Sequence, residues 1–172
     1  KLMMMLQTNV DGKFMEKQLG ACERKCRCGK TTHETPLVVL TGGPGSGKTA
    51  VLEMAKKVFC QHTVVLPEAA SILFGGGFWR LSSESAKSAA QRAIFHIQKE
   101  METVVLSEKK WALGLCDRGT LDGLAYWPGT ADDFWKGVQS QHNSELKKYN
   151  SVIHLRTPMA SHGYNHQNPL RT

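Results

Sequence analysis

The sequence has no hydrophobic run that could cross a membrane, since none approaches about 18 consecutive apolar residues. The apolar opening at residues 2–6 is also shorter than a signal-peptide core of about 7–15 residues. Acidic residues are outnumbered, with 15 Asp and Glu against 22 Lys and Arg. The resulting net charge of +7 suits an anionic partner, but no long basic stripe concentrates it, which argues against nucleic acid. We therefore expect a cytoplasmic protein without membrane contact.

Cysteine is also scarce, and the five thiols are an odd number. Without a secretory segment, this number favours a reduced, intracellular protein over a disulfide framework. Cys60 and Cys116 lie in apolar stretches, which is typical of inert core thiols. Three further thiols lie near His33 but lack the second Cys/His pair of a zinc module: Cys22, Cys26 and Cys28. We favour a polar extension that contains thiols over a zinc site.

The pattern of apolar segments predicts one α/β domain. Residues 1–35 are polar and basic and form an N-terminal extension, whereas residues 36–172 alternate between strand and helix patterns. Strands are expected at 37–41, 62–66, 111–116 and 151–155, and helices at 48–59, 69–73, 84–109, 120–126 and 132–139. This alternation predicts a three-layer fold with a mostly parallel sheet. Since such sheets usually have about five strands or more, we expect a further strand and helix after residue 172.

Apolar periodicity also predicts which helix faces are buried. The long helix begins after Ser83, a plausible N-cap, and its expected buried stripe is Ala90, Ile94, Ile97, Met101, Val104 and Val105. For the helix over 48–59 the expected buried stripe is Val51, Leu52, Ala55 and Val58. The tryptophans at 111, 127 and 135 are interpreted as packing residues.

One motif carries specific chemistry. Residues 42–49 read GGPGSGKT, which matches the P-loop pattern G-x-x-x-x-G-K-[ST] between an expected strand and an expected helix. Backbone amides of such a loop and the helix N-terminus bind phosphates, Lys48 reaches the β- and γ-phosphates, and the Thr49 hydroxyl ligates Mg²⁺. The predicted nucleotide-binding residues are Gly43, Pro44, Gly45, Ser46, Gly47, Lys48, Thr49 and Ala50. We expect the ligand to be a nucleoside triphosphate, ATP with Mg²⁺.

Two carboxylates at strand ends are further candidates. Asp117 ends an apolar strand and is predicted to hold Mg²⁺; the alternative is an N-cap or turn contact. The next residue is Arg118, which can contact a phosphate or acceptor, rather than the Glu with which hydrolytic P-loop proteins polarise water. Glu68 ends another strand and can accept a proton from a substrate hydroxyl; the alternative is a solvated loop carboxylate.

Several segments together resemble a known family: Thr41–Thr49, Pro67–Ala70, and Asp117–Gly119 with Asp122 and Ala125–Tyr126. They are similar to the AAA-domain P-loop family that includes nicotinamide riboside kinase-like ATPases. The similarity to deoxynucleoside and thymidylate kinases, which carry an acidic–Arg pair in the same place, is more distant. The resemblance covers residues 37–172 and does not fix a substrate.

The resemblance also implies roles for individual residues. Glu68 would be a base or substrate contact, Asp117 the magnesium acid, and Arg118 a phosphate or substrate contact. Residues 168–172 look like the family's lid, which would make Arg171 a phosphate clamp.

These observations favour a kinase that transfers the γ-phosphoryl group of Mg-ATP to a small hydroxyl-bearing, nucleoside-like metabolite. The alternative is an ATPase or regulatory nucleotide switch that acts on a protein partner. The guanine-reading N-K-x-D motif is absent, which argues against a GTPase, and so is the L-S-G-G-Q signature of ABC transporters.

Overall fold

The computed structural model describes residues 30–157. The three thiols at 22, 26 and 28 and the lid candidate Arg171 lie outside the described residues. Within the described part of the chain, no helix has the length and apolar character needed to cross a bilayer.

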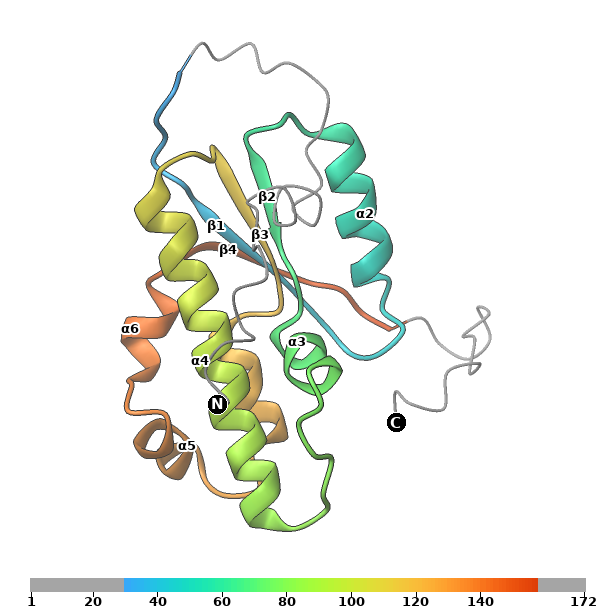
Figure 1. The fold of residues 1–172 in the computed structure, drawn as a ribbon, viewed down its shortest axis with the longest axis vertical. Coiled ribbons are helices and arrows are strands. Elements are labelled where there is room, and N and C mark those ends of the chain that lie inside the picture. Colours follow the sequence, from blue (N-terminus) through green and yellow to red (C-terminus); the bar gives the residue numbers. More distant parts are fainter. Residues whose placement is uncertain (1–29, 158–172) are drawn as a thin grey trace, which may run out of the picture.

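Four parallel strands form one sheet in the order β2-β3-β1-β4 (Figure 1). They are β1 (Leu37–Thr41), β2 (Thr63–Leu66), β3 (Leu113–Asp117) and β4 (Tyr149–His154). The predicted α/β class with a parallel sheet is therefore confirmed. Because β1 and β3 are direct neighbours, with Leu40 opposite Asp117, the loops that follow these two strands begin side by side. Ligands of open α/β sheets bind at this carboxyl edge.

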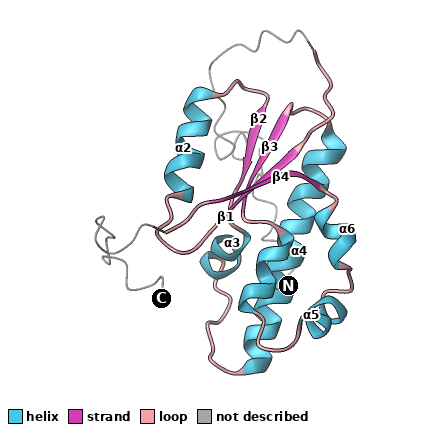
Figure 2. Cartoon of the chain, turned by 180° about the vertical axis from the view of Figure 1, so that it is seen from behind, coloured by secondary structure: helices cyan, strands magenta, loops and turns pink. Residues whose placement is uncertain are grey.

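Helices cover both faces of the sheet. Figure 2 shows α2 (Lys48–Val58) on one face and α4 (Glu84–Glu108) on the other. Packed near α4 are α3 (Ala69–Gly75), the 3₁₀ helix η1 (Thr120–Tyr126), α5 (Ala131–Gly137) and α6 (His142–Leu146). The N-cap prediction is confirmed, since the Ser83 hydroxyl accepts a hydrogen bond from the Ala86 amide. The five-residue α6 was not predicted, because its sequence is too short and polar for periodicity to reveal it.

The strands β1, β2 and β3 are largely buried, as their continuous apolar runs predict, whereas the edge strand β4 is mostly exposed. Along β1, Leu37 and Val39 pack toward α4 together with Val105. Leu40 packs on the opposite face against Leu52 and Ala55 of α2. The predicted packing role of the three tryptophans is confirmed, since Trp111 lies against the first cluster and Trp127 and Trp135 lie against a third around Phe95, Phe134 and Val138.

The predicted buried stripes of the two long helices are wrong in part. Of the stripe predicted on α2, Leu52 and Ala55 are buried, but Val51 and Val58 are 44% and 54% exposed. On α4, Val104 is 49% exposed, whereas Gln98 and Glu102 are 2% and 1% exposed. On α4, apolar periodicity misplaces the stripe because the polar side chains of Gln98 and Glu102 occupy part of the buried face.

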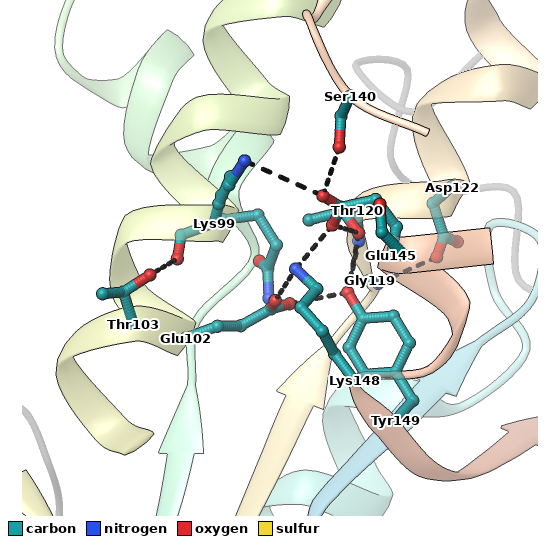
Figure 3. Close-up of polar contacts among 12 residues, drawn as sticks. Lys99, Glu102, Thr103, Gly119, Thr120, Asp122, Ser140, Glu145, Lys148 and Tyr149 are labelled. Carbon is teal, nitrogen blue, oxygen red and sulfur yellow. Dashed lines mark hydrogen bonds and ion pairs between the residues drawn. The ribbon is translucent and has the colours of Figure 1, made fainter. Parts of the chain in front are cut away.

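These polar side chains belong to a buried ionic cluster, most of which is drawn in Figure 3: Gln98, Glu102, Thr120, Ser140, Glu145, Lys148 and Tyr149. The Lys148 ammonium lies 2.7 Å from Glu102 Oε2 and 2.5 Å from Glu145 Oε2. The Tyr149 hydroxyl donates to Glu102 Oε1 at 2.7 Å and accepts from the Thr120 amide at 2.7 Å. The cluster therefore ties α4, α6 and β4 to the first residue of η1.

Replacing Lys148 with methionine is expected to destabilise the fold by about 3–5 kcal/mol at neutral pH, because two buried carboxylates would lose their shared cation. Burial alone raises the pKa of Glu145, but hydrogen bonds from Lys148, Ser140 and Thr120 outweigh it and lower that pKa. The ionised Glu145 thus stabilises the folded wild type at pH values above the pKa that Glu145 has in the unfolded chain. This contribution to the free energy of unfolding is lost as the pH falls through the lower pKa that Glu145 has in the folded protein.

The stability gap between the wild type and Lys148→Met should therefore narrow below about pH 4.5, near the ordinary pKa of Glu145. Urea unfolding at several pH values measures it. Lys147→Met, at the exposed neighbouring position, is the matched control and should stay close to wild type. A gap that does not depend on pH would contradict the assignment of the loss to charge pairing.

Candidate functional site

The P-loop connects β1 to α2 through a backbone that only glycine adopts readily. Gly45 and Gly47 have φ angles of 71° and 87°, in the left-handed region. Gly42 lies so close to β4 that an added Cβ would be 2.2 Å from the Leu155 carbonyl oxygen. A curled loop that ends at the N-terminus of an 11-residue helix is a phosphate-binding geometry.

Lys48 is held inside this loop. The residue is 8% exposed, and its ammonium donates to the carbonyl oxygens of Gly42 and Gly43 at 2.8 and 3.0 Å. Burial, followed by the charge of Arg118, lowers the pKa of Lys48, although nearby carboxylates partly oppose the change. The ammonium is thus a buried cation whose hydrogen-bond acceptors are neutral carbonyl oxygens. The oxygens of an anionic phosphate are stronger acceptors and can replace them.

Asp117 places a carboxylate at the end of β3, and one of its oxygens lacks a hydrogen-bond partner among the described residues. This atom, Oδ1, is buried. Burial, and then the charge of Glu68, raises the pKa of Asp117. Thr49 and Asp117 line the same cleft, and carboxylate and hydroxyl oxygens are ligands that Mg²⁺ prefers. These residues therefore fit a magnesium ion, and an N-cap contact for Oδ1 is not observed.

Arg118 and Glu68 are paired with one another. Arg118 Nε donates to Glu68 Oε1 at 3.0 Å, and Ser71 Oγ donates to Glu68 Oε2 at 2.6 Å. Burial raises the pKa of Glu68, but the hydrogen bonds from Ser71 and Arg118 outweigh it, so that the pKa is lowered. Glu68 is therefore an ionised, oriented carboxylate inside the site rather than a solvated loop residue.

Asp122 belongs to the segments that carry the family resemblance, but sequence reasoning gave it no role in the site. Its Oδ1 accepts from Thr41 Oγ1 at 2.5 Å and from Arg118 Nη1 at 3.3 Å, and its Oδ2 accepts from the Gly119 amide at 2.8 Å. Asp122 thus joins the end of β1 to the start of η1 and orients Arg118. A signal was present, because an acid three residues after a helix N-cap position is the acidic half of a capping box.

A cleft of about 740 Å³ connects these groups. One part is lined by Pro44–Ala50, Glu68, Asp117 and Arg118, so the structure brings together nearly all the predicted site residues. Gly43 does not line the cleft but accepts a bond from Lys48. The rest of the wall lies outside the predicted site residues and comes from α3, α4, η1 and the loop before α4, with Phe74, Arg80, Gln91, Ile94, Phe95, Gln98 and Tyr126.

Comparison with known proteins identifies a family. A family model described as an AAA domain matches residues 37–172. No curated protein matches the chain. Domains of this P-loop type bind nucleotides and hydrolyse or transfer a phosphoryl group, and the match does not distinguish these two reactions.

Proposed function

The chain belongs to this AAA-domain family of P-loop NTPases, and we propose that it is a kinase that transfers the γ-phosphoryl group of Mg-ATP to a small hydroxyl-bearing, nucleoside-like metabolite. The observation that carries the proposal is the cleft, which joins the P-loop to a second wall that includes Phe74, Ile94 and Tyr126. A further part of the proposal is that residues 36–172 form the nucleotide-binding domain and residues 1–35 a basic extension.

In this proposal the P-loop holds the phosphates of ATP. Lys48 exchanges its carbonyl partners for phosphate oxygens, and residues 43–50 surround them. Thr49 and Asp117 hold Mg²⁺, and the unpartnered Asp117 oxygen supports this role. When bound, Mg²⁺ neutralises the charge of the transferred phosphoryl group.

Glu68 and Arg118 serve the acceptor. A carboxylate with a lowered pKa is a weak base. Phosphoryl transfer passes through a loose transition state, however, so that catalysis depends mainly on the correct position of the acceptor hydroxyl and less on the strength of the base. Glu68 therefore orients the acceptor hydroxyl and takes its proton as the new bond forms. Arg118, held by Glu68 and Asp122, adds positive charge where a hydrolytic protein would place an acid for water.

The second candidate function is an ATPase or nucleotide switch that moves a protein partner. It is favoured by apolar side chains on and just after α2 that are exposed among the described residues: Val51, Met54, Val58 and Phe59, at 44–66%. Exposed apolar patches commonly mark protein interaction sites.

Product analysis distinguishes the two functions. The protein is incubated with ATP and Mg²⁺, with and without a pool of nucleosides and vitamins. For a kinase we expect ADP only with the pool, together with a newly phosphorylated compound. ADP and free phosphate at the same rate without the pool would overturn the kinase proposal and support the ATPase.

A further inference from the structure

We infer that His33 and His62 bind a zinc ion together with two thiols from the preceding extension, Cys22 and Cys26. The two histidines lie just before β1 and β2, at the amino edge of the sheet (Figure 1). The nucleotide cleft lies at the carboxyl edge, so this inference goes beyond the proposed function and does not depend on it. The zinc ion is structural and fastens the N-terminal extension to the sheet.

The described half of the site is a pair of imidazole rings in contact. The ring centroids of His33 and His62 are 4.7 Å apart, and the rings are tilted by 52°. Within residues 30–157, His33 Nε2 is buried without a hydrogen-bond partner. Buried polar atoms are normally paired, and a neutral imidazole nitrogen is a common zinc ligand. The pair therefore fits two of the ligands of a zinc site.

One short segment of backbone holds both histidines in place. The His33 amide donates to the Lys109 carbonyl oxygen at 2.8 Å. The His62 carbonyl oxygen accepts from the amides of Ala112 and Leu113 at 2.7 and 3.3 Å. Both rings are thus carried by backbone that is bonded to the connection between α4 and β3. Because the fold already brings these two ligands together, zinc binding does not have to order them.

The remaining ligands must come from outside the described residues. A structural zinc site is tetrahedral, with four protein ligands. Among residues 30–157, no group of three or more His, Cys, Asp or Glu side chains could hold a metal ion. Before residue 30, Cys22 and Cys26 are separated by three residues, within the spacing of about two to four that is typical of zinc-binding cysteine pairs. The sequence lacks a second pair beside these thiols, and the fold supplies one by bringing His62 to His33.

The chain between the thiols and the histidines is short. Cys26 precedes His33 by seven residues, and an extended chain spans at most about 3.6 Å per residue, so their backbones lie within about 25 Å of each other. A ligand tethered at this range has an effective concentration of about millimolar. Zinc therefore has to order only a short segment to complete the site.

The local charge suits two thiolates. Two lysines and one carboxylate line the same pocket as His33: Lys30, Lys109 and Glu34. The excess of ammonium groups favours the thiolate over the thiol. Each thiol gives its proton to solvent when its sulfur binds zinc. Two thiolates then balance the two positive charges of the ion, so the lysines do not oppose its binding.

The test measures metal binding by the full chain, purified without a histidine tag and stripped with a chelator. Elemental analysis after zinc is added back should give one zinc ion per chain. Cobalt(II) is the spectroscopic probe, for which we expect intense visible absorption from a tetrahedral site and a near-ultraviolet band from two cobalt–thiolate bonds. This measurement needs no variant to fold, and a wild type that binds no zinc would overturn the inference.

Variants then assign the ligands. Cys22→Ser, Cys26→Ser and His62→Ala should each lower the zinc affinity by more than the about 10- to 100-fold that outer-shell changes cost, as measured by competition with a chromophoric chelator. The matched controls are the neighbouring thiol, in Cys28→Ser, and an exposed histidine at the end of β4, in His154→Ala. Both controls should bind zinc like the wild type, and circular dichroism checks that each variant remains folded.

Three results with the variants or the thiols would contradict the inference. Wild-type zinc affinity in His62→Ala would show that the histidine pair is not part of the site. Loss of zinc in Cys28→Ser but not in Cys22→Ser would overturn the choice of thiols, and so would a disulfide between Cys22 and Cys26 that persists when zinc is present. None of these results bears on the kinase proposal, because product analysis with ATP tests the other edge of the sheet.

Discussion

Lys48→Ala is expected to weaken binding of Mg-ATP about 10- to 100-fold and to lower turnover by a further factor of about 100–1,000. The ammonium is buried and bonded to two carbonyl oxygens of the loop, so it is already positioned where the phosphates would lie. Its removal leaves those carbonyls without their donor and the site without the charge that assists transfer. Titration calorimetry with a non-hydrolysable ATP analogue measures the binding loss.

The control for this variant lies on the same helix. Lys57 is exposed, so Lys57→Ala changes the net charge equally without touching the loop, and its affinity should remain at the wild-type value. Circular dichroism of both variants checks that α2 remains folded. Wild-type affinity in Lys48→Ala would contradict a phosphate-binding role for the P-loop lysine.

Local sequence predicts where the strands lie, and it also predicts that the site lies at the ends of these strands. Each apolar run produces a strand within two residues of its predicted start. For β1, β2 and β3 the reason is burial on both faces, which gives a strand the same pattern wherever it lies in the sheet, whereas β4 is an exposed edge strand. The ends of the strands then indicate Glu68 and Asp117, since parallel strands present their carboxyl ends at one edge. The adjacency of β1 and β3, which brings Asp117 beside the P-loop, required the structure.

The wall of the cleft and the buried ionic cluster could not be predicted in this way. Glu102 looks like a solvent-exposed helix residue, and its burial depends on Lys148 and Tyr149, 46 and 47 positions later in the chain. The pairing of Glu68 with Arg118 spans 50 positions. No window of the sequence contains both partners of these contacts, so periodicity cannot identify them.

The turn after β3 shows why these distant contacts matter for the site. Arg118 has a φ of 73°, which is an unusual value for a residue with a side chain. The turn at this residue directs the four successive residues 117–120 to different partners. Asp117 points to the cleft, Arg118 to Glu68, and Gly119 packs on the Tyr149 ring, where an added Cβ would be 3.0 Å from the hydroxyl oxygen. Thr120 continues into the ionic cluster. The cluster therefore anchors the turn that carries the proposed magnesium acid.

Asp117→Asn is expected to lower magnesium-dependent turnover about 1,000-fold while sparing part of the ATP affinity, because the amide keeps an oxygen but loses the charge that balances Mg²⁺. Turnover as a function of Mg²⁺ concentration measures the loss. Asp132→Asn, at an exposed position of α5, is the matched control and should behave like the wild type. Wild-type turnover in Asp117→Asn would mean that the magnesium acid lies elsewhere.

The same substitution should make the nucleotide-free protein more stable. Because burial and Glu68 raise the folded pKa of Asp117, its ionised form costs stability at neutral pH, and acidification below its ordinary pKa of 3.8 removes that cost. The stability advantage of Asp117→Asn should thus be largest at neutral pH and shrink as pH falls through the raised pKa. Urea unfolding of wild type and variant at pH 7 and in acid measures this difference. A variant that is less stable than the wild type at neutral pH would show that the Asp117 carboxylate is satisfied without a cation. A variant that is more stable but has lost turnover would show that the ionised Asp117 lowers the stability of the nucleotide-free protein and is needed to bind the cation.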